Sequence, residues 1–225
     1  MKILYMGSWG RGYQCIKDLQ QRNDISIEMV FTQYDPDSSD SYFNLVHDYA
    51  VEHQIPVFNI HNKTSVMVNQ DILDYLEKNS CENIIGLSVA FEKIFKKNLL
   101  EQMKIINLHP SLLPKYRGPS PEFWALKNGE KHIGITLHWI NEGIDTGNIL
   151  YQDEFKIDYQ MTFSQFIDQL NENSSKVIND FLDLHQNPQK LRGIQQTDLS
   201  LYYERIHEGH DYFDKSLSEI QMSLN

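Results

Sequence analysis

The sequence predicts an α/β fold with a mostly parallel sheet and a short C-terminal tail. Short apolar runs alternate along the chain with segments whose apolar residues recur at helical spacing. Turn-forming residues separate several of these runs. The first strand is expected at Lys2–Met6, because KILYM is apolar and Gly7 closes it; GSWGRGYQ then predicts a turn that opens a helix.

The next elements continue the alternation of strands and helices. ISIEMVF predicts a second strand, and SYFNLVHDYAVEHQ, after the turn cluster DPDSSD, predicts a helix. The strand and helix pattern then repeats up to His109 in PVFNI, SVMVNQDILDYLEKN, NIIGLSV, KIFKKNLLEQM and KIINLH. Such alternation is typical of a parallel sheet covered on both faces, with ligands outside the carboxyl ends of the strands.

The second half of the chain follows a different pattern. SPEFWALKNG predicts a helix that ends at Gly129, and HIGITLHWI and GNILYQDEFKI predict a hairpin because only the turn NEGIDTG separates them. A long helix begins at Thr162, which forms a capping-box pattern with Gln165. We expect one domain over residues 1–187, and a polar, irregular extension over residues 188–225 that packs on it.

Composition narrows the functional classes. The chain has 225 residues, of which 40% are hydrophobic and 23% charged, as in a soluble globular protein. Only Cys15 and Cys81 are present, which favours neither a disulfide framework nor a metal site, and the N-terminus resembles neither a signal peptide nor a membrane span. The net charge of -11 opposes nucleic-acid binding. We therefore expect a cytoplasmic protein with no metal, no membrane contact and no nucleic-acid partner.

Polar side chains gather where the strand KIINLH ends. Asn107 and His109 are two residues apart, so on a strand they project to the same side. A carboxamide and an imidazole together suit a carbonyl oxygen that gains charge and a proton that must be moved. Asp145, in the turn after the next strand, would orient the imidazole if the two strands pair. No Ser or Cys with a matched base lies nearby, which favours direct attack on a bound acyl donor.

Other motifs in the sequence are weaker evidence of a functional site. DTG occurs once, whereas an aspartic protease needs two such aspartates. Gly7, Gly10 and Gly12 lack dinucleotide-binding spacing and predict only a tight turn. His132 and His138 are expected at loop and strand positions without a role.

INLHPSLLPKYRG and NGEKHIGITLHWINEGIDTGNIL resemble the formyltransferases that use 10-formyltetrahydrofolate, with the strongest match from about Gly86 to about Gln152. The resemblance implies a Rossmann-like formyltransferase domain and 10-formyltetrahydrofolate as the co-substrate. It implies that Asn107 bonds the formyl oxygen, that His109 stabilises the oxyanion or moves a proton, and that Asp145 orients His109. It also implies a pteridine slot formed by Ser88, Val89, Ala90, Phe91, Ile94, Ile140, Gly143 and Ile144.

Within that family, the stretches PKYRGPSPEFWALKNGE and EGIDTGNI look most like the sugar N-formyltransferases. The implied acceptor is a dTDP-linked amino-dideoxy sugar, best dTDP-4-amino-4,6-dideoxyglucose, used in lipopolysaccharide O-antigen or other surface glycan synthesis. Trp9 would stack on the base, while Arg11, Lys115 and Arg117 would meet the pyrophosphate.

Other acceptors fit the sequence less well. The acidic, short chain disfavours a methionyl-tRNA acceptor, which needs a second domain that binds nucleic acid. Trp9 and Arg11 replace the Ser-Asn pair expected of phosphoribosylglycinamide formyltransferases, which remain an alternative. A further alternative is a non-catalytic protein that binds folate or a sugar nucleotide. The aromatic-rich tail favours a homodimer.

Overall fold

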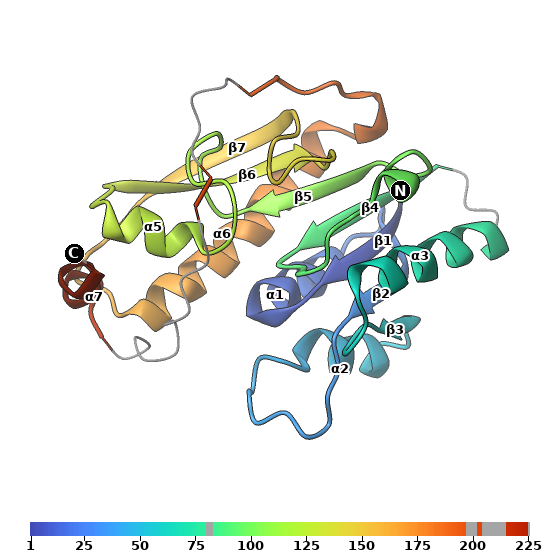
Figure 1. Ribbon diagram of the computed structural model, residues 1–225, viewed down its shortest axis with the longest axis horizontal. Coiled ribbons are helices and arrows are strands. Elements are labelled where there is room, and N and C mark those ends of the chain that lie inside the picture. Colours follow the sequence, from blue (N-terminus) through green and yellow to red (C-terminus); the bar gives the residue numbers. More distant parts are fainter. Residues whose placement is uncertain (80–82, 197–201, 204–214, 225) are drawn as a thin grey trace.

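The structure is a computed structural model, which describes residues 1–79, 83–196, 202–203 and 215–224. Its centre is a seven-stranded sheet in the order β3-β2-β1-β4-β5-β6-β7 (Figure 1). The strands from β1 to β5 run parallel, whereas β6 pairs antiparallel with both β5 and β7. The strands are β1 (Lys2–Gly7), β2 (Ser26–Thr32), β3 (Val57–Asn59), β4 (Ile84–Val89), β5 (Ile105–His109), β6 (His132–Trp139) and β7 (Ile149–Lys156). The α/β fold with its mostly parallel sheet is therefore confirmed, including the β6–β7 hairpin.

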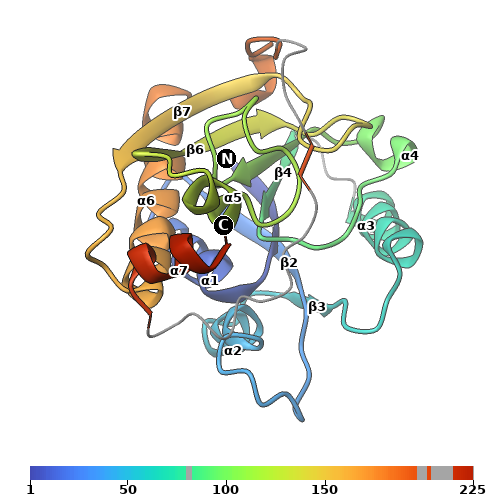
Figure 2. The same ribbon diagram turned by 60° about the vertical axis from the view of Figure 1, so that its left-hand side comes forward.

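Helices cover both faces of this sheet (Figure 2). The α-helices are α1 (Trp9–Leu19), α2 (Leu45–Glu52), α3 (Ser65–Asn79), α4 (Lys97–Leu100), α5 (Pro121–Lys127), α6 (Phe163–Leu184) and α7 (Leu217–Leu224). Alternate residues of β1 face opposite ways: Ile3 and Tyr5 pack with α1, α2 and α6, whereas Leu4 and Met6 pack with α3 and α4. The near-continuous apolar runs in the sequence follow from this burial on two faces.

Helix α4 is shorter than the sequence predicts. Backbone groups in the segment before it bond to α3 side chains instead of forming a helical turn. Asn69 donates to the Ile94 carbonyl (2.8 Å) and accepts from the Lys96 N–H (2.7 Å), and the Ile94 N–H donates to Ser65 (3.0 Å). The loop after β4 is therefore tied to α3, and the helix begins only at Lys97.

The described parts of the C-terminal extension lie against the domain. Ile194 and Ile149 exchange backbone hydrogen bonds of 2.7 and 2.8 Å, after a short 3₁₀ turn (η1, Pro188–Lys190). Leu217 and Ile220 of α7 pack in one apolar cluster with residues of α5 and α6. Of the tail aromatics from which a homodimer is expected, Tyr212 and Phe213 lie outside the described residues, as does Cys81.

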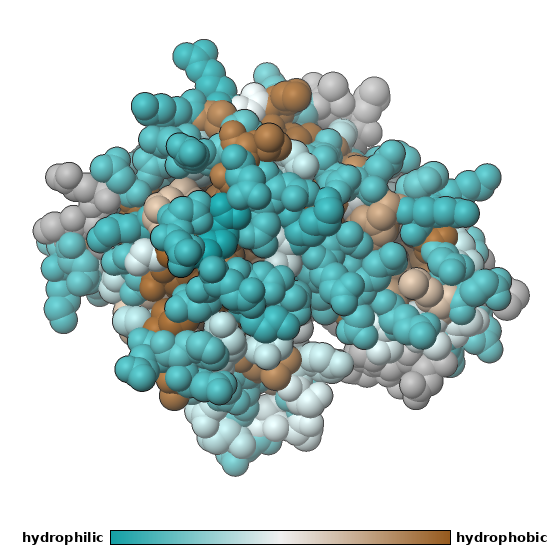
Figure 3. All heavy atoms as spheres, turned by 180° about the vertical axis from the view of Figure 1, so that it is seen from behind, coloured by the Kyte–Doolittle hydropathy of each residue, from teal (hydrophilic) through white to brown (hydrophobic). Residues whose placement is uncertain are grey.

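Polar side chains cover most of the face in Figure 3, where apolar side chains gather in a few groups. Within the described ranges, no helix is both long and apolar enough to cross a membrane.

Candidate active site

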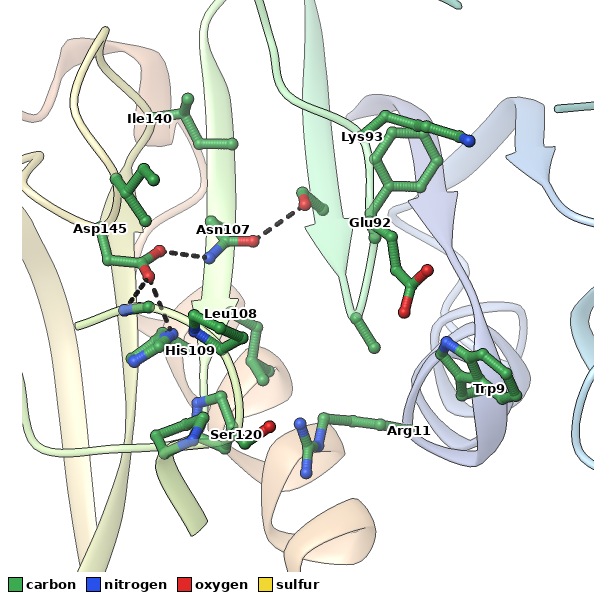
Figure 4. Close-up of a pocket in the computed structure, with 18 of the residues that line it drawn as sticks. Trp9, Arg11, Glu92, Lys93, Asn107, Leu108, His109, Ser120, Ile140 and Asp145 are labelled. Atoms are coloured by element: carbon green, nitrogen blue, oxygen red, sulfur yellow. Dashed lines mark hydrogen bonds and ion pairs between the residues drawn. The ribbon is translucent and has the colours of Figure 1, made fainter. Parts of the chain in front are cut away.

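Three polar residues face one another in register across neighbouring strands. Ser88 of β4 pairs with Asn107 of β5, and Asn107 pairs with His138 of β6. The Ser88 hydroxyl donates to Asn107 Oδ1 (2.8 Å), so the Asn107 carboxamide presents its Nδ2 hydrogens to the other side. Nδ2 lies 3.2 Å from His138 Nε2, while His138 Nδ1 donates to the Trp139 carbonyl (2.8 Å). The strand register thus holds an amide donor at the edge of the cavity in Figure 4.

Asp145 approaches this row from the loop between β6 and β7. Its Oδ2 accepts from the Gly118 N–H (2.9 Å) and lies 3.5 Å from His109 Nδ1. Its Oδ1 lies 3.5 Å from His138 Nε2 and 3.5 Å from Asn107 Nδ2. The sequence predicts no role for His138, a lone histidine on a strand, yet the structure places its Nε2 beside both Asn107 and Asp145. Only the strand register could have indicated this position.

His109 is 5% exposed, and its Nε2 lies 2.8 Å from the Tyr116 carbonyl. A carbonyl only accepts, so Nε2 carries the proton and Nδ1, facing Asp145, is the atom that can take a second one. Burial lowers the pKa of His109, although the neighbouring Asp145 carboxylate acts to raise it. Burial also acts to raise the pKa of Asp145, but His109, His138 and the Gly118 N–H outweigh it and hold that pKa well below its usual range. At neutral pH the pair is a neutral imidazole beside a carboxylate.

A cavity of about 940 Å³ opens over these side chains. Its lining includes an apolar region from the loop after β4 and the loop after β6, where Phe91 stacks on Phe95 with ring centroids 5.5 Å apart. Of the residues expected in the pteridine slot, the lining includes Ser88, Ala90, Phe91, Ile94, Ile140, Gly143 and Ile144. Val89 is fully buried in the core and is not in the lining. Apart from Val89, the residues expected in the pteridine slot therefore line a single cavity.

Charged side chains line the cavity near α1 and α5. Trp9 and Arg11 extend from the N-terminal turn of α1 (Figure 4), and Glu122 belongs to the first turn of α5. Arg11 Nε and Glu122 Oε2 are buried, and neither has a hydrogen-bond partner in the described part of the chain. Leaving a buried polar atom without a partner is costly, and both of these atoms belong to side chains that line the cavity.

Lys115 and Arg117, the other cations expected at the pyrophosphate, are not in the lining of the cavity. The Lys115 ammonium pairs with Glu130 (3.0 Å), and the Arg117 guanidinium donates to Gln196 (3.0 and 2.7 Å).

Unusual backbone conformations gather around the cavity. The left-handed region, with positive φ, is uncommon for residues other than glycine and is often found at functional sites. Cavity-lining residues in that region are Trp9 (φ 62°), Ala90 (φ 51°), Ser120 (φ 57°) and Asp145 (φ 52°). In the part of the chain that the structure describes, no group of at least three His, Cys, Asp or Glu residues is arranged to hold a metal ion.

Comparisons of the sequence and of the fold with known proteins all find formyltransferases. A family model described as "Formyl transferase" matches residues 1–182. The methionyl-tRNA formyltransferase of Finegoldia magna is 29% identical over 211 residues, which are 92% of this chain and 66% of that enzyme. This chain thus spans slightly less than two thirds of that relative.

Solved structures share the fold at lower identity. The phosphoribosylglycinamide formyltransferase of Bacillus halodurans has a TM-score of 0.70 at 19% sequence identity. The match covers 85% of this chain and 99% of that enzyme. An N-formyltransferase from Helicobacter canadensis, in complex with folinic acid and dTDP-3-aminofucose, has a TM-score of 0.67 at 22% identity. That match covers 91% of this chain and 71% of the other.

Proposed function

Because the chain belongs to the formyl transferase family, we propose that it moves a formyl group from 10-formyltetrahydrofolate to an amine in the cavity described above. One observation carries this proposal: a carboxamide, a neutral imidazole and a carboxylate converge at one point of the cavity. Asn107, His109 and Asp145 supply these groups, with contacts between them of 3.5 Å.

The reaction follows from the chemistry of these side chains. The amine nitrogen attacks the formyl carbon, and the carbonyl electron pair moves to oxygen, where an Asn107 N–H stabilises it. Such a donor contributes about 10²–10³-fold to the rate. The proton leaving the amine passes to His109 Nδ1, where the Asp145 carboxylate stabilises the charge. Collapse of the intermediate then breaks the bond between the formyl carbon and N10 of the folate, and N10 takes up the proton that His109 accepted, so that the imidazole is neutral again.

The donor is assigned to the apolar region of the cavity. We place the pteridine ring between the loop that contains Phe91 and Ile94 and the loop that contains Ile140 and Ile144, all of which line the cavity. Apolar surface with a few polar groups at one end is the usual environment of a bound cofactor. This placement leaves the formyl group next to Asn107.

We assign the acceptor to the region of Trp9, Arg11 and Glu122. A nucleotide-linked amino sugar has a base that can stack on Trp9, a pyrophosphate for Arg11, and amine or hydroxyl hydrogens for Glu122. The best candidate is dTDP-4-amino-4,6-dideoxyglucose, for synthesis of a surface glycan. The Helicobacter canadensis neighbour, which is described with a dTDP-linked amino sugar, supports this class of acceptor.

Methionyl-tRNA is the second candidate acceptor. The net charge of -11 disfavours it, but methionyl-tRNA formyltransferases at about 30% identity are among the curated relatives. Glycinamide ribonucleotide is the third, since a phosphoribosylglycinamide formyltransferase shares the fold.

Formyl transfer with purified protein separates these candidates. The assay follows release of tetrahydrofolate from 10-formyltetrahydrofolate in the presence of dTDP-linked 3- and 4-amino sugars, methionyl-tRNA or glycinamide ribonucleotide. Rapid turnover with one amino sugar alone is expected. Turnover only with tRNA or the ribonucleotide would replace the acceptor and keep the mechanism. Donor binding without turnover on any acceptor would favour a binding protein.

A further inference from the structure

Gln196 lies in the C-terminal extension, outside residues 1–182 that the family model matches, yet its side chain reaches the loop that carries Asp145. It is 8% exposed. Two residues before it, Ile194 exchanges backbone hydrogen bonds with Ile149 of β7, which fixes this segment against the sheet. The side chain therefore enters the active-site region from a well-anchored backbone.

Both ends of the Gln196 carboxamide are bonded. Nε2 donates to the Asp145 carbonyl (2.9 Å) and to the Gly147 carbonyl (2.8 Å). Oε1 accepts from Arg117 Nε (3.0 Å) and Nη2 (2.7 Å). Since a guanidinium only donates, Arg117 fixes which end of the amide is the oxygen and aims the nitrogen at the loop.

The loop that receives these hydrogen bonds has an uncommon backbone conformation and passes close to a neighbouring strand. Asp145 has a φ of +52°, and a Cβ on Gly147 would lie 1.7 Å from the Trp139 carbonyl oxygen. Residues in sparsely populated conformations persist only where the surroundings hold them. Gln196 bonds the backbone on both sides of Thr146, while Gly118, next to Arg117, bonds the Asp145 carboxylate.

We propose that Gln196, oriented by Arg117, is a positioning residue that holds the Asp145 backbone and thereby sets the distance between its carboxylate and His109. This role also accounts for Arg117, whose guanidinium faces Gln196 and not the cavity. The effect on turnover rests on the proposed formyl transfer, whereas the effect on His109 does not.

The test compares Gln196→Ala and Gln196→Glu with the wild-type protein. The Glu variant keeps the size of the side chain and its contact with Arg117, but it cannot donate to the Asp145 and Gly147 carbonyls. Gln189→Ala is the matched control, because Gln189 is in the same extension and donates to the Ile84 carbonyl (3.0 Å), away from the site. Circular dichroism establishes that each variant is folded.

The first readout is the pKa of His109, measured by NMR with labelled histidine. The groups that face this ring are Asp145, His138 and Glu122, together with the Tyr116 carbonyl. Displacing the carboxylate of Asp145 removes a charge that raises the pKa of His109, so that pKa is expected to fall further in Gln196→Ala and to stay unchanged in Gln189→Ala. Gln196→Glu adds a carboxylate that itself acts to raise the pKa of His109, so this variant is judged by turnover.

The second readout is turnover on the acceptor that the wild-type protein accepts. We expect kcat to fall about 10–100-fold in both Gln196 variants, as for other residues that orient a functional group, with KM values nearly unchanged. An unchanged His109 titration in a folded Gln196→Ala protein would overturn the proposal. If the wild-type protein transfers no formyl group at all, the titration alone decides the positioning role.

Discussion

At the scale of the residue, the account depends on the protonation state of His109. This side chain acts as a base only when it is neutral, and burial lowers its pKa below the usual value of 6.5. As the pH falls through this lowered pKa, the ring takes up a proton and activity is lost. We therefore predict that the acid limb of the kcat/KM profile that reports His109 lies below pH 6.5.

Asp145→Asn provides the internal check on this pH profile. Removing the carboxylate removes the main influence that raises the pKa of His109, so the acid limb of the residual activity is expected at still lower pH. An acid limb well above pH 6.5 in the wild-type protein, or one that rises in the variant, would contradict the assigned base.

A second prediction at the scale of the residue concerns the role of Glu122 in binding the acceptor. Its buried Oε2 has no hydrogen-bond partner among the described residues, so a polar group of the acceptor is its expected partner. Glu122→Gln is predicted to raise the acceptor KM about tenfold, the effect of losing one charge-assisted hydrogen bond, and to leave donor binding unchanged. Glu130→Gln is the control, because Glu130 pairs with Lys115 and is not in the cavity lining. Equal KM values for the wild-type protein and Glu122→Gln would remove Glu122 from the acceptor site.

At the scale of the element, the register of β4, β5 and β6 orients the carboxamide of Asn107, for which a catalytic role is proposed. Ser88→Ala removes the donor that holds Asn107 Oδ1, so the carboxamide can rotate. We predict a loss of about tenfold in kcat, smaller than the loss of about 10²–10³-fold expected for Asn107→Ala. The unfolding free energy should fall by about 1 kcal/mol, measured by urea denaturation. Equal kcat values for Ser88→Ala and wild type would show that packing alone orients Asn107.

The loop between β6 and β7 gives another prediction. A Cβ at Gly147 would lie 1.7 Å from the Trp139 carbonyl oxygen, so Gly147→Ala must displace the loop that carries Asp145. We predict a destabilisation of more than about 2 kcal/mol by urea denaturation, together with loss of turnover. Gly10→Ala is the comparison, because its Cβ would meet only side-chain atoms at 3.2 Å or more. Equal stability of these two variants would show that the loop tolerates displacement.

The sequence predicts the elements better than their contacts. Asn107 and His109 are two residues apart on a strand, so the sequence alone predicts that they project to the same face of the sheet. The β6–β7 hairpin then brings Asp145 next to them. His138 becomes part of the site only through the pairing of β5 with β6, and Gln196 only through a contact across 51 positions of the chain. Neither contact has a local periodic signal. The short α4 has a similar cause, since Asn69 of the preceding helix bonds the backbone before it.

At the scale of the whole molecule, the cavity lies where the parallel part of the sheet meets the antiparallel hairpin. The loop after β4 and the N-terminal turn of α1 line it from the parallel part, while α5 and the loop after β6 line it from the other side (Figures 1 and 4). The apolar region proposed for the donor and the charged region proposed for the acceptor both border Asn107 and His109 in this one cavity. A ligand at the carboxyl ends of parallel strands is the general rule for such sheets.

The most direct test of this account is the comparison of wild-type protein with His109→Ala in turnover and in donor binding. Turnover is measured with the best acceptor, and the dissociation constant for the folate donor by equilibrium titration. We predict a loss of about 10²–10⁴-fold in kcat with little change in the donor dissociation constant, because His109 acts on the reacting atoms. Equal turnover of the two proteins would contradict the assignment of this cavity as the place where the formyl group is transferred.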